Sequence, residues 1–246
     1  MASEIELTEL EKEAYDLISD CLKFSFIFLR LPEKLEIGFV PFSSGLFEHK
    51  NVPCFTTGDG RRIIFNTDWL KRSLPDHVED VRFFAFHELR HVHQKNQIVL
   101  QKSGLQVDES SETIKRWDDD FAHYTTNQGD AVNQEQNLQQ EVEKDANAYA
   151  LALINMYHIG EDWEAEFSLP EEAFAAADDR SREYYSSRPE LKRFIDKVRR
   201  EKTGQNPAGK RPDAYSLCPC GSGKSLSFAV IRRAFTIETF TGQICK

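Results

Sequence analysis

The sequence places two histidines and a glutamate in the middle of a strongly apolar stretch, Phe-Ala-Phe-His-Glu-Leu-Arg-His-Val, at residues 84–92. Ionisable side chains of this kind seldom enter a protein core without partners. The apolar residues from 78 to 92 recur with the period of an α-helix, and Asp76 is the expected N-cap. Because residues four apart share one face of a helix, we expect His87 and His91 to project side by side. The fold must therefore bury a helix that carries two adjacent imidazoles.

The five residues from His87 to His91 match the pattern H-E-x-x-H. In this pattern the two histidines bind one metal ion, and the glutamate acts as a general base toward a bound water. The alternative interpretation is a chance match, with both histidines as ordinary hydrogen-bonded core groups. The apolar frame favours a site that is shielded from bulk water. We therefore predict that His87 and His91 bind zinc and that Glu88 is the catalytic base.

A zinc hydrolase needs a third protein ligand and an open fourth position. The stretch from 139 to 160 predicts a buried helix that is acidic at its start and almost wholly apolar afterwards. Glu141, Glu143 and Asp145 lie where this helix becomes apolar. The alternative is an acidic first turn that only complements the helix dipole. That alternative explains Glu141 well, but it explains less well the acids that continue into the apolar part.

The two motifs in this order, His87-Glu88-x-x-His91 and Glu-Lys-Asp-Ala-Asn-Ala-Tyr-Ala at 143–150, resemble gluzincin-type zinc metallopeptidases. They are most similar to the small ImmA/IrrE-like group, whose third-ligand helix reads E-x-E-A-[ND]-x-[FY]-A. The resemblance covers residues 55–155 and implies a zincin-like metallopeptidase domain.

The resemblance implies specific roles on the second helix. Glu143 takes the place of the third zinc ligand, and Asn147 takes the place of the residue that orients a ligating histidine. Asp145 stands where the group often has a second glutamate. A competing register, in which Glu141 is the ligand and Asp145 supports it, stays open. His91 and Glu143 are 52 residues apart, which is longer than is typical of the group, and a polar insert accounts for the difference.

The remaining pattern predicts an α+β fold with a small antiparallel sheet. We expect a long opening helix ended by Pro32, a strand at 34–42, and two strands within 51–70 around a Gly-Asp-Gly turn at 58–60. The resemblance implies that the strand at 61–66 is an edge strand that binds an extended substrate.

The polar insert at 103–137 is predicted to be a long loop with one helical piece at 114–124. Within it, His123 and Tyr124 are candidates for contacting the reacting carbonyl oxygen, although surface positions are the simpler expectation for both. Two further polar helices are expected between 170 and 201.

A Gly/Pro-rich linker divides the sequence into a main domain at 1–202 and a tail at 203–246. The tail segment Cys218-Pro-Cys220-Gly-Ser-Gly-Lys resembles the start of the SEC-C zinc motif. The second ligand pair of that motif is replaced by Ala-Val at 229–230, and Cys245 lies far away. Two thiolates provide half of a tetrahedral zinc site.

The formal net charge of −10 argues against general binding to nucleic acid backbones. Residues 201–246, by contrast, carry seven basic and three acidic side chains. The five cysteines form no disulfide framework, no apolar stretch is long enough for a membrane span, and the acidic N-terminus lacks signal-peptide features. The sequence therefore predicts a cytoplasmic protein.

The leading functional hypothesis is a zinc metallopeptidase that hydrolyses peptide bonds of an intracellular protein, with zinc as the cofactor. The alternative is a non-catalytic zinc-binding adaptor whose basic tail binds a protein or nucleic-acid partner. Glu88 distinguishes the two, because a purely structural metal site needs no base beside its open position. Cleavage of a regulator in a stress or phage circuit is suggested by family analogy alone.

Overall fold

The computed structural model describes residues 8–26, 28–125, 136–158, 175–181, 193, 197 and 238–241. Residues 175–181 are helical, and most of the expected polar helices at 170–201 lie outside the described residues. The tail motif with Cys218, Cys220 and Cys245 also lies outside them. Within the described part of the chain, no helix is long and apolar enough to cross a membrane.

The opening helix α1 spans Glu9–Ser25. A reciprocal capping box fixes its start, because the Thr8 hydroxyl accepts from the Glu11 amide while the Glu11 carboxylate accepts from the Thr8 amide. The helix ends before the expected boundary at Pro32. The amides of Phe28 and Leu29 both bond to the Ser25 carbonyl, and this turn directs Leu29 into the core.

A small mixed sheet has the strand order β2-β3-β1-β4. Its strands are β1 (Glu36–Val40), β2 (Cys54–Thr56), β3 (Arg62–Asn66) and β4 (Glu238–Thr241). The expected antiparallel sheet is wrong in part, because β1 runs parallel to both β3 and β4, and only β2 and β3 are antiparallel. The chain between β1 and β3 is long enough to return and to place β2 on the far side of β3.

The expected edge strand at 61–66 is also wrong. This segment is β3, which lies between β2 and β1, so the edge of the sheet on this side is β2. The hairpin that joins β2 and β3 turns at residues 57–61, where Gly60 has φ = 68°.

Two helices follow β3 directly. The helix α2 spans Thr67–Ser73, and its first part replaces the end of the strand that the sequence predicted within 51–70. The Asn66 side chain caps it by accepting from the amides of Asp68 and Trp69. The helix α3 spans Val78–Lys102 and begins after His77, which replaces the expected cap Asp76 and makes no side-chain capping bond.

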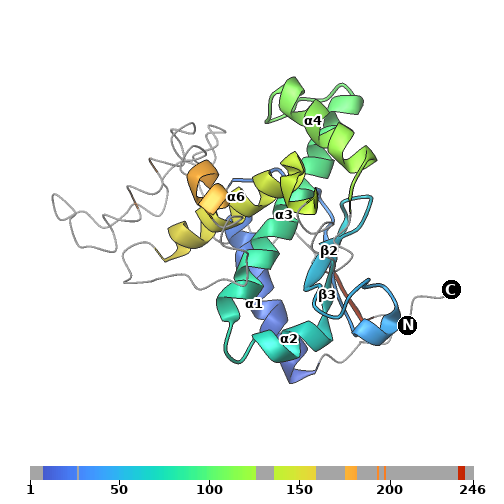
Figure 1. Cartoon of the computed structure of the whole chain (residues 1–246), viewed down its shortest axis with the longest axis vertical. Coiled ribbons are helices and arrows are strands. Elements are labelled where there is room, and N and C mark those ends of the chain that lie inside the picture. The colour runs from blue at the N-terminus through green and yellow to red at the C-terminus, as the bar shows by residue number, and fades with distance from the viewer. Residues whose placement is uncertain are drawn as a thin grey trace.

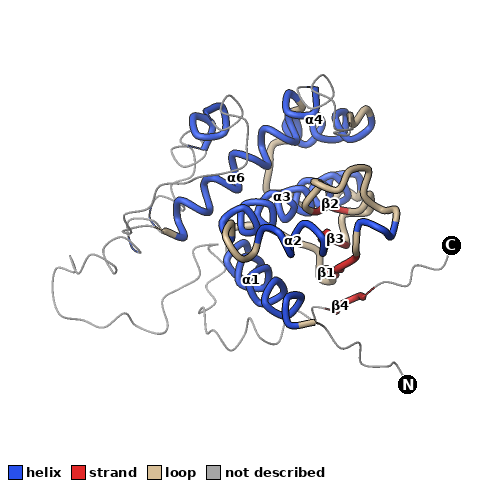
Figure 2. Tube along the Cα trace, turned by 60° about the horizontal axis from the view of Figure 1, so that its bottom comes forward, coloured by secondary structure: helices blue, strands red, loops and turns tan. Residues whose placement is uncertain are grey.

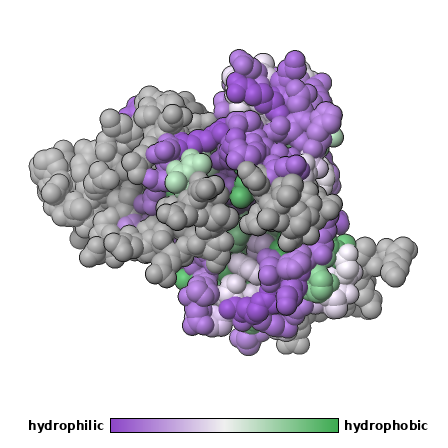
Figure 3. All heavy atoms as spheres, viewed as in Figure 1, coloured by the Kyte–Doolittle hydropathy of each residue, from purple (hydrophilic) through white to green (hydrophobic). Residues whose placement is uncertain are grey.

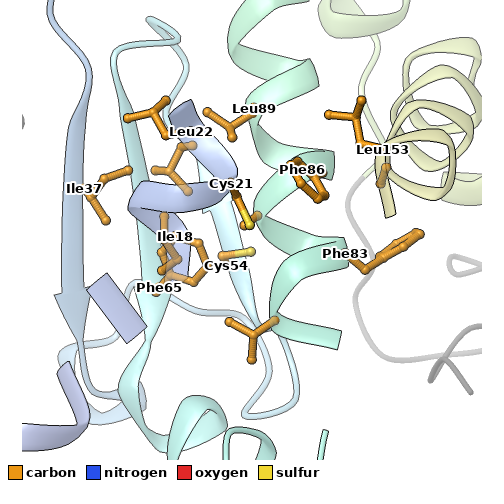
Figure 4. Close-up of a cluster of buried hydrophobic side chains, with 14 of the residues drawn as sticks. Ile18, Cys21, Leu22, Ile37, Cys54, Phe65, Phe83, Phe86, Leu89 and Leu153 are labelled. Carbon is orange, nitrogen blue, oxygen red and sulfur yellow. The ribbon is translucent and has the colours of Figure 1, made fainter. Parts of the chain in front are cut away.

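The core lies where α3 meets the sheet and α1 on one side and α6 (Glu141–Tyr157) on the other (Figure 4). Figure 4 shows side chains from α1, from β1, β2 and β3, and from α3 and α6. Its labelled members are Ile18, Cys21, Leu22, Ile37, Cys54, Phe65, Phe83, Phe86, Leu89 and Leu153. Helix α6 runs across α3 (Figures 1 and 2), and the two helices pack against each other. This crossing brings the two sequence motifs together.

The insert contains α4 (Ser111–Ala122), which packs on the C-terminal half of α3 and the start of α6 (Figure 1). A second, smaller apolar cluster holds it there, built around Trp117 with Ile98, Ile114 and Val142. The outer surface at the α4 end is strongly hydrophilic (Figure 3). Residues 126–135, in the remainder of the insert, lie outside the described residues.

Candidate metal centre

Helix α3 presents His87 and His91 on one face, and both side chains are buried. Their ring centroids are 4.6 Å apart with nearly perpendicular planes. The two Nε2 atoms face each other at 3.0 Å. The expectation that residues four apart on this helix share one site is therefore met, because both Nε2 atoms point to the same position.

Helix α6 brings Glu143 to the same position. Its Oε1 lies 3.1 Å from His91 Nε2, and its Oε2 lies 3.3 Å from His87 Nε2. Within the described residues, His87, His91 and Glu143 form the group of side chains with metal-ligand spacing. The competing register is not what the structure shows, because Glu141 pairs with Arg180 and Lys144 near the surface.

Amide side chains fix the orientation of both imidazoles. Asn147 Oδ1 lies 2.9 Å from His87 Nδ1, and Gln94 Oε1 lies 2.8 Å from His91 Nδ1. A carbonyl oxygen only accepts, so each Nδ1 carries a hydrogen, and each imidazole in its neutral form keeps its lone pair on Nε2. Asn147 thus occupies the supporting position that the family resemblance implies for it.

The facing atoms are the two Nε2 atoms and the two carboxylate oxygens of Glu143. All are electron-pair donors, and a positive centre among them would make their approach favourable. Zinc ligands in proteins lie 2.0–2.2 Å from the ion, which places tetrahedral N and O ligands about 3.3 Å from one another. The separations here are 3.0, 3.1 and 3.3 Å. Two imidazoles and one carboxylate therefore fit a divalent metal in spacing and in donor chemistry.

Glu88 is buried beside this group and is held by strand β2. Its Oε2 accepts a 2.7 Å hydrogen bond from the Thr56 hydroxyl, and its Oε1 lies 3.9 Å from the Cys54 thiol. Cys54 and Thr56 are two residues apart on one strand, so both side chains point to the same face. The edge strand thus sets the position of the Glu88 carboxylate.

The shared position affects protonation of its members. Burial disfavours the charged form of His87, but the adjacent Glu143 raises the pKa of His87 overall. Burial also acts to raise the pKa of Glu143, yet the two histidines hold it well below its usual range. A proton on the imidazole side of this pair and a metal ion are electrostatically similar, because each places positive charge beside the Glu143 carboxylate.

The insert contributes Tyr124, whose hydroxyl donates a 2.5 Å hydrogen bond to Glu143 Oε1. Burial of the hydroxyl and the charge of Glu143 raise the pKa of Tyr124. Asn137 and Gln140 hold the segment in place through the Thr125 carbonyl. Tyr124 is 38% exposed, so the expected surface position is confirmed for the residue, although its hydroxyl is turned inward against Glu143. His123 is exposed, and its Nδ1 bonds to the Asp119 carbonyl.

Lys95, one turn beyond His91, closes the end of the edge strand. Its ammonium donates to the carbonyls of Thr56 at 3.3 Å and Thr57 at 2.9 Å, and it lies 4.9 Å from the Phe121 ring centroid. Burial lowers the pKa of Lys95. Lys95 thus joins β2 to α4 beside the candidate site.

Sequence reasoning missed Gln94, Thr56 and Lys95. Gln94 and Lys95 could have been predicted, since they lie three and four residues after His91 on the same helix and therefore next to it on the helix surface. Thr56 has no such local signal, because its contact with Glu88 depends on how β2 packs on α3.

Comparison of the chain with protein-family models, with curated proteins and with solved structures finds no match in any of the three. The geometry of the site therefore carries the functional argument.

Proposed function

We propose that this protein is a zinc-dependent metallopeptidase in which His87, His91 and Glu143 hold the metal and Glu88 is the general base. The observation that carries the proposal is the convergence of two Nε2 lone pairs and one carboxylate at ligand spacing. The α+β fold class and the order of the two motifs support this proposal, because both agree with the gluzincin-type enzymes that the sequence resembles.

A bound zinc ion supplies Lewis acidity toward a carbonyl oxygen and lowers the pKa of a water to about 7. The residues of this chain supply the rest of the chemistry. Glu88 is next to the first histidine and is oriented by Thr56, so its carboxylate can accept a proton at Oε1 or Oε2 and pass it to the leaving amine. Asn147 and Gln94 keep the imidazoles in the tautomer that a metal requires.

The edge strand β2 is suited to bind an extended peptide backbone next to Glu88. Phe55 pairs with Ile64 of β3, so the main-chain groups of Cys54 and Thr56 point to the outer edge. A peptide added there would run past the Glu88 carboxylate. Because Lys95 already occupies the Thr56 carbonyl, the paired stretch would be short at that end.

One observation favours the alternative of a non-catalytic zinc protein. Each of His87, Glu88, His91 and Glu143 is only 5–7% exposed, and closed surroundings are typical of structural metal sites. A buried carboxylate that is not needed as a ligand favours catalysis, because a structural site does not require Glu88.

The decisive experiment combines zinc content with hydrolysis of fluorescent casein for the wild type, Glu88→Gln and His91→Ala. We expect about one zinc per chain in both the wild type and Glu88→Gln. Only the wild type should hydrolyse casein, because Glu88→Gln keeps the zinc but lacks the base. His91→Ala should lose both. Full casein hydrolysis by Glu88→Gln would contradict the proposed mechanism. If the wild type bound zinc but neither it nor the variants hydrolysed casein, the result would favour the adaptor.

A further inference from the structure

A buried chain of polar side chains leads away from His91. Gln94 contacts His91, Asp145 contacts Gln94, and Arg90 contacts Asp145. Arg90 is 1% exposed and binds both Asp145 oxygens, at 2.7 and 3.2 Å. Its Nη2 also donates to Glu109 Oε1 at 3.1 Å, in the segment that leads into α4. Helices α3 and α6 are thus joined by a largely buried polar network.

The orientation of the Gln94 amide is fixed by this network. Its Nε2 donates to Asp145 Oδ2 at 2.7 Å and to the Val142 carbonyl at 3.1 Å. Both partners are pure acceptors, so a rotated amide would place its oxygen against two oxygens. The amide oxygen must therefore face His91 Nδ1.

The orientation of Gln94 in turn selects the tautomer of His91. An oxygen at Nδ1 requires a hydrogen on Nδ1, which leaves Nε2 free to bind a metal. With the amide reversed, a donor would face Nδ1, and the hydrogen would move to Nε2 at the metal position.

We propose that Asp145 is a positioning residue for the metal centre, which acts through Gln94 to hold His91 in the tautomer with hydrogen on Nδ1. The proposal rests on the metal site described under the proposed function. It gives Asp145 a role that is neither that of a ligand nor that of a direct support of a ligand. Asn147 performs the same task for His87 by direct contact and provides an internal comparison.

The first test reads the tautomer directly, in metal-free protein at alkaline pH where imidazoles are neutral. Long-range nitrogen–proton NMR spectra of histidine-labelled protein distinguish hydrogen on Nδ1 from hydrogen on Nε2. We expect the Nδ1 form for His87 and His91 in the wild type. Gln94→Leu and Asp145→Asn should shift His91 toward the Nε2 form and leave His87 unchanged. The matched control Asn147→Leu should do the reverse.

The second test is a double-mutant cycle on zinc affinity. Gln94→Leu and Asp145→Asn should each weaken zinc binding about 10–100-fold, as losses around a ligand typically do. If Asp145 acts through Gln94, Asp145→Asn should have less than about a twofold effect in the Gln94→Leu background. Thermal melts identify any variant that fails to fold, and Gln94→Leu keeps the Arg90–Asp145 ion pair in case Asp145→Asn does not fold.

Two results would overturn the proposal. One is an unchanged His91 tautomer in Asp145→Asn, and the other is an additive cycle, which would mean that Asp145 acts only by supporting the fold. Failure of the proposed function looks different, because a wild type that binds no zinc would still show the tautomer shifts.

Discussion

Glu143 and His87 influence each other's charge in the metal-free protein, because the carboxylate lies 3.3 Å from the imidazole. The pKa of His87 is raised above 6.5 and that of Glu143 is lowered below 4.5. We expect Glu143→Gln to lower the pKa of His87, since burial then acts without the neighbouring charge. Titration of the histidine signals by NMR in the presence of a chelator measures this shift.

The same pair makes a pH-dependent contribution to stability. Because the pKa of His87 is raised in the folded protein, its contribution to folding stability is complete below pH 6.5 and is lost as the pH rises through the folded pKa. Because the pKa of Glu143 is lowered, its contribution is complete above pH 4.5 and is lost as the pH falls through the folded pKa. The difference in unfolding free energy between wild type and Glu143→Gln should therefore be largest between pH 4.5 and 6.5. A difference that grew steadily toward alkaline pH would contradict this account.

The Thr56 hydroxyl makes the shorter of the two contacts that β2 has with the Glu88 carboxylate. Thr56→Val removes the 2.7 Å hydrogen bond to the carboxylate without changing the shape of the residue much. A hydrogen bond to a charged group contributes about 1.5–3 kcal/mol, so casein hydrolysis should fall at least roughly tenfold while zinc content stays the same. Thr57→Val is the matched control, because the Thr57 hydroxyl bonds to Asp59 instead. Equal losses in both variants would argue against a specific role of Thr56.

Among the secondary-structure elements, the β2–β3 hairpin is locked to α3 by a close approach. Gly60 has φ = 68°, and a Cβ there would lie 2.9 Å from Lys95 Cβ. Gly60→Ala should therefore destabilise the fold by more than the approximately 1–2 kcal/mol that the left-handed conformation costs alone. Gly104→Ala is a matched control, because Gly104 has φ = 67° with open space around it. Urea unfolding of both variants measures the excess, and equal costs would mean that Lys95 moves aside freely.

The elements that carry local signals could be predicted from the sequence. His87 and His91 share a face because of helix geometry alone, and the two strands expected around the Gly-Asp-Gly turn are present as β2 and β3. The strand order could not be predicted, since an alternating pattern says which face a strand buries and not which strand lies beside it. Helix α2 was missed because Trp69 and Leu70 read as a continuation of β3, although Asn66 carries a capping signal.

The candidate site also contains some residues that the sequence could predict and others that it could not. The choice of Glu143 over Glu141 followed from the family-like residues after it, whereas periodicity allowed both. The contacts of Thr56 and Tyr124 come from chain segments 32 and 19 residues away from their partners. They depend on the packing of β2 and α4 against the two metal helices, which no local pattern specifies.

At the scale of the whole molecule, the division at residue 202 stays a prediction. The contacts that build the candidate site come from residues 54–147, whereas β4 pairs with β1 at the opposite edge of the sheet from β2. We expect residues 1–202 to fold and to bind zinc as tightly as the full chain, with a modest loss of stability from the missing strand. Calorimetric zinc titration and thermal melts of both proteins measure this. A large loss of zinc affinity would show that the tail supports the site.

The burial of the site also determines how quickly a metal ion can be exchanged. The three side chains that would hold the ion are 5–7% exposed, and the Tyr124 hydroxyl lies against one of them. We therefore expect the departure of a bound ion to require movement of the segment at Tyr124, which follows α4, in addition to the breaking of coordination bonds. We expect that loosening this segment accelerates metal exchange even where the equilibrium affinity is preserved.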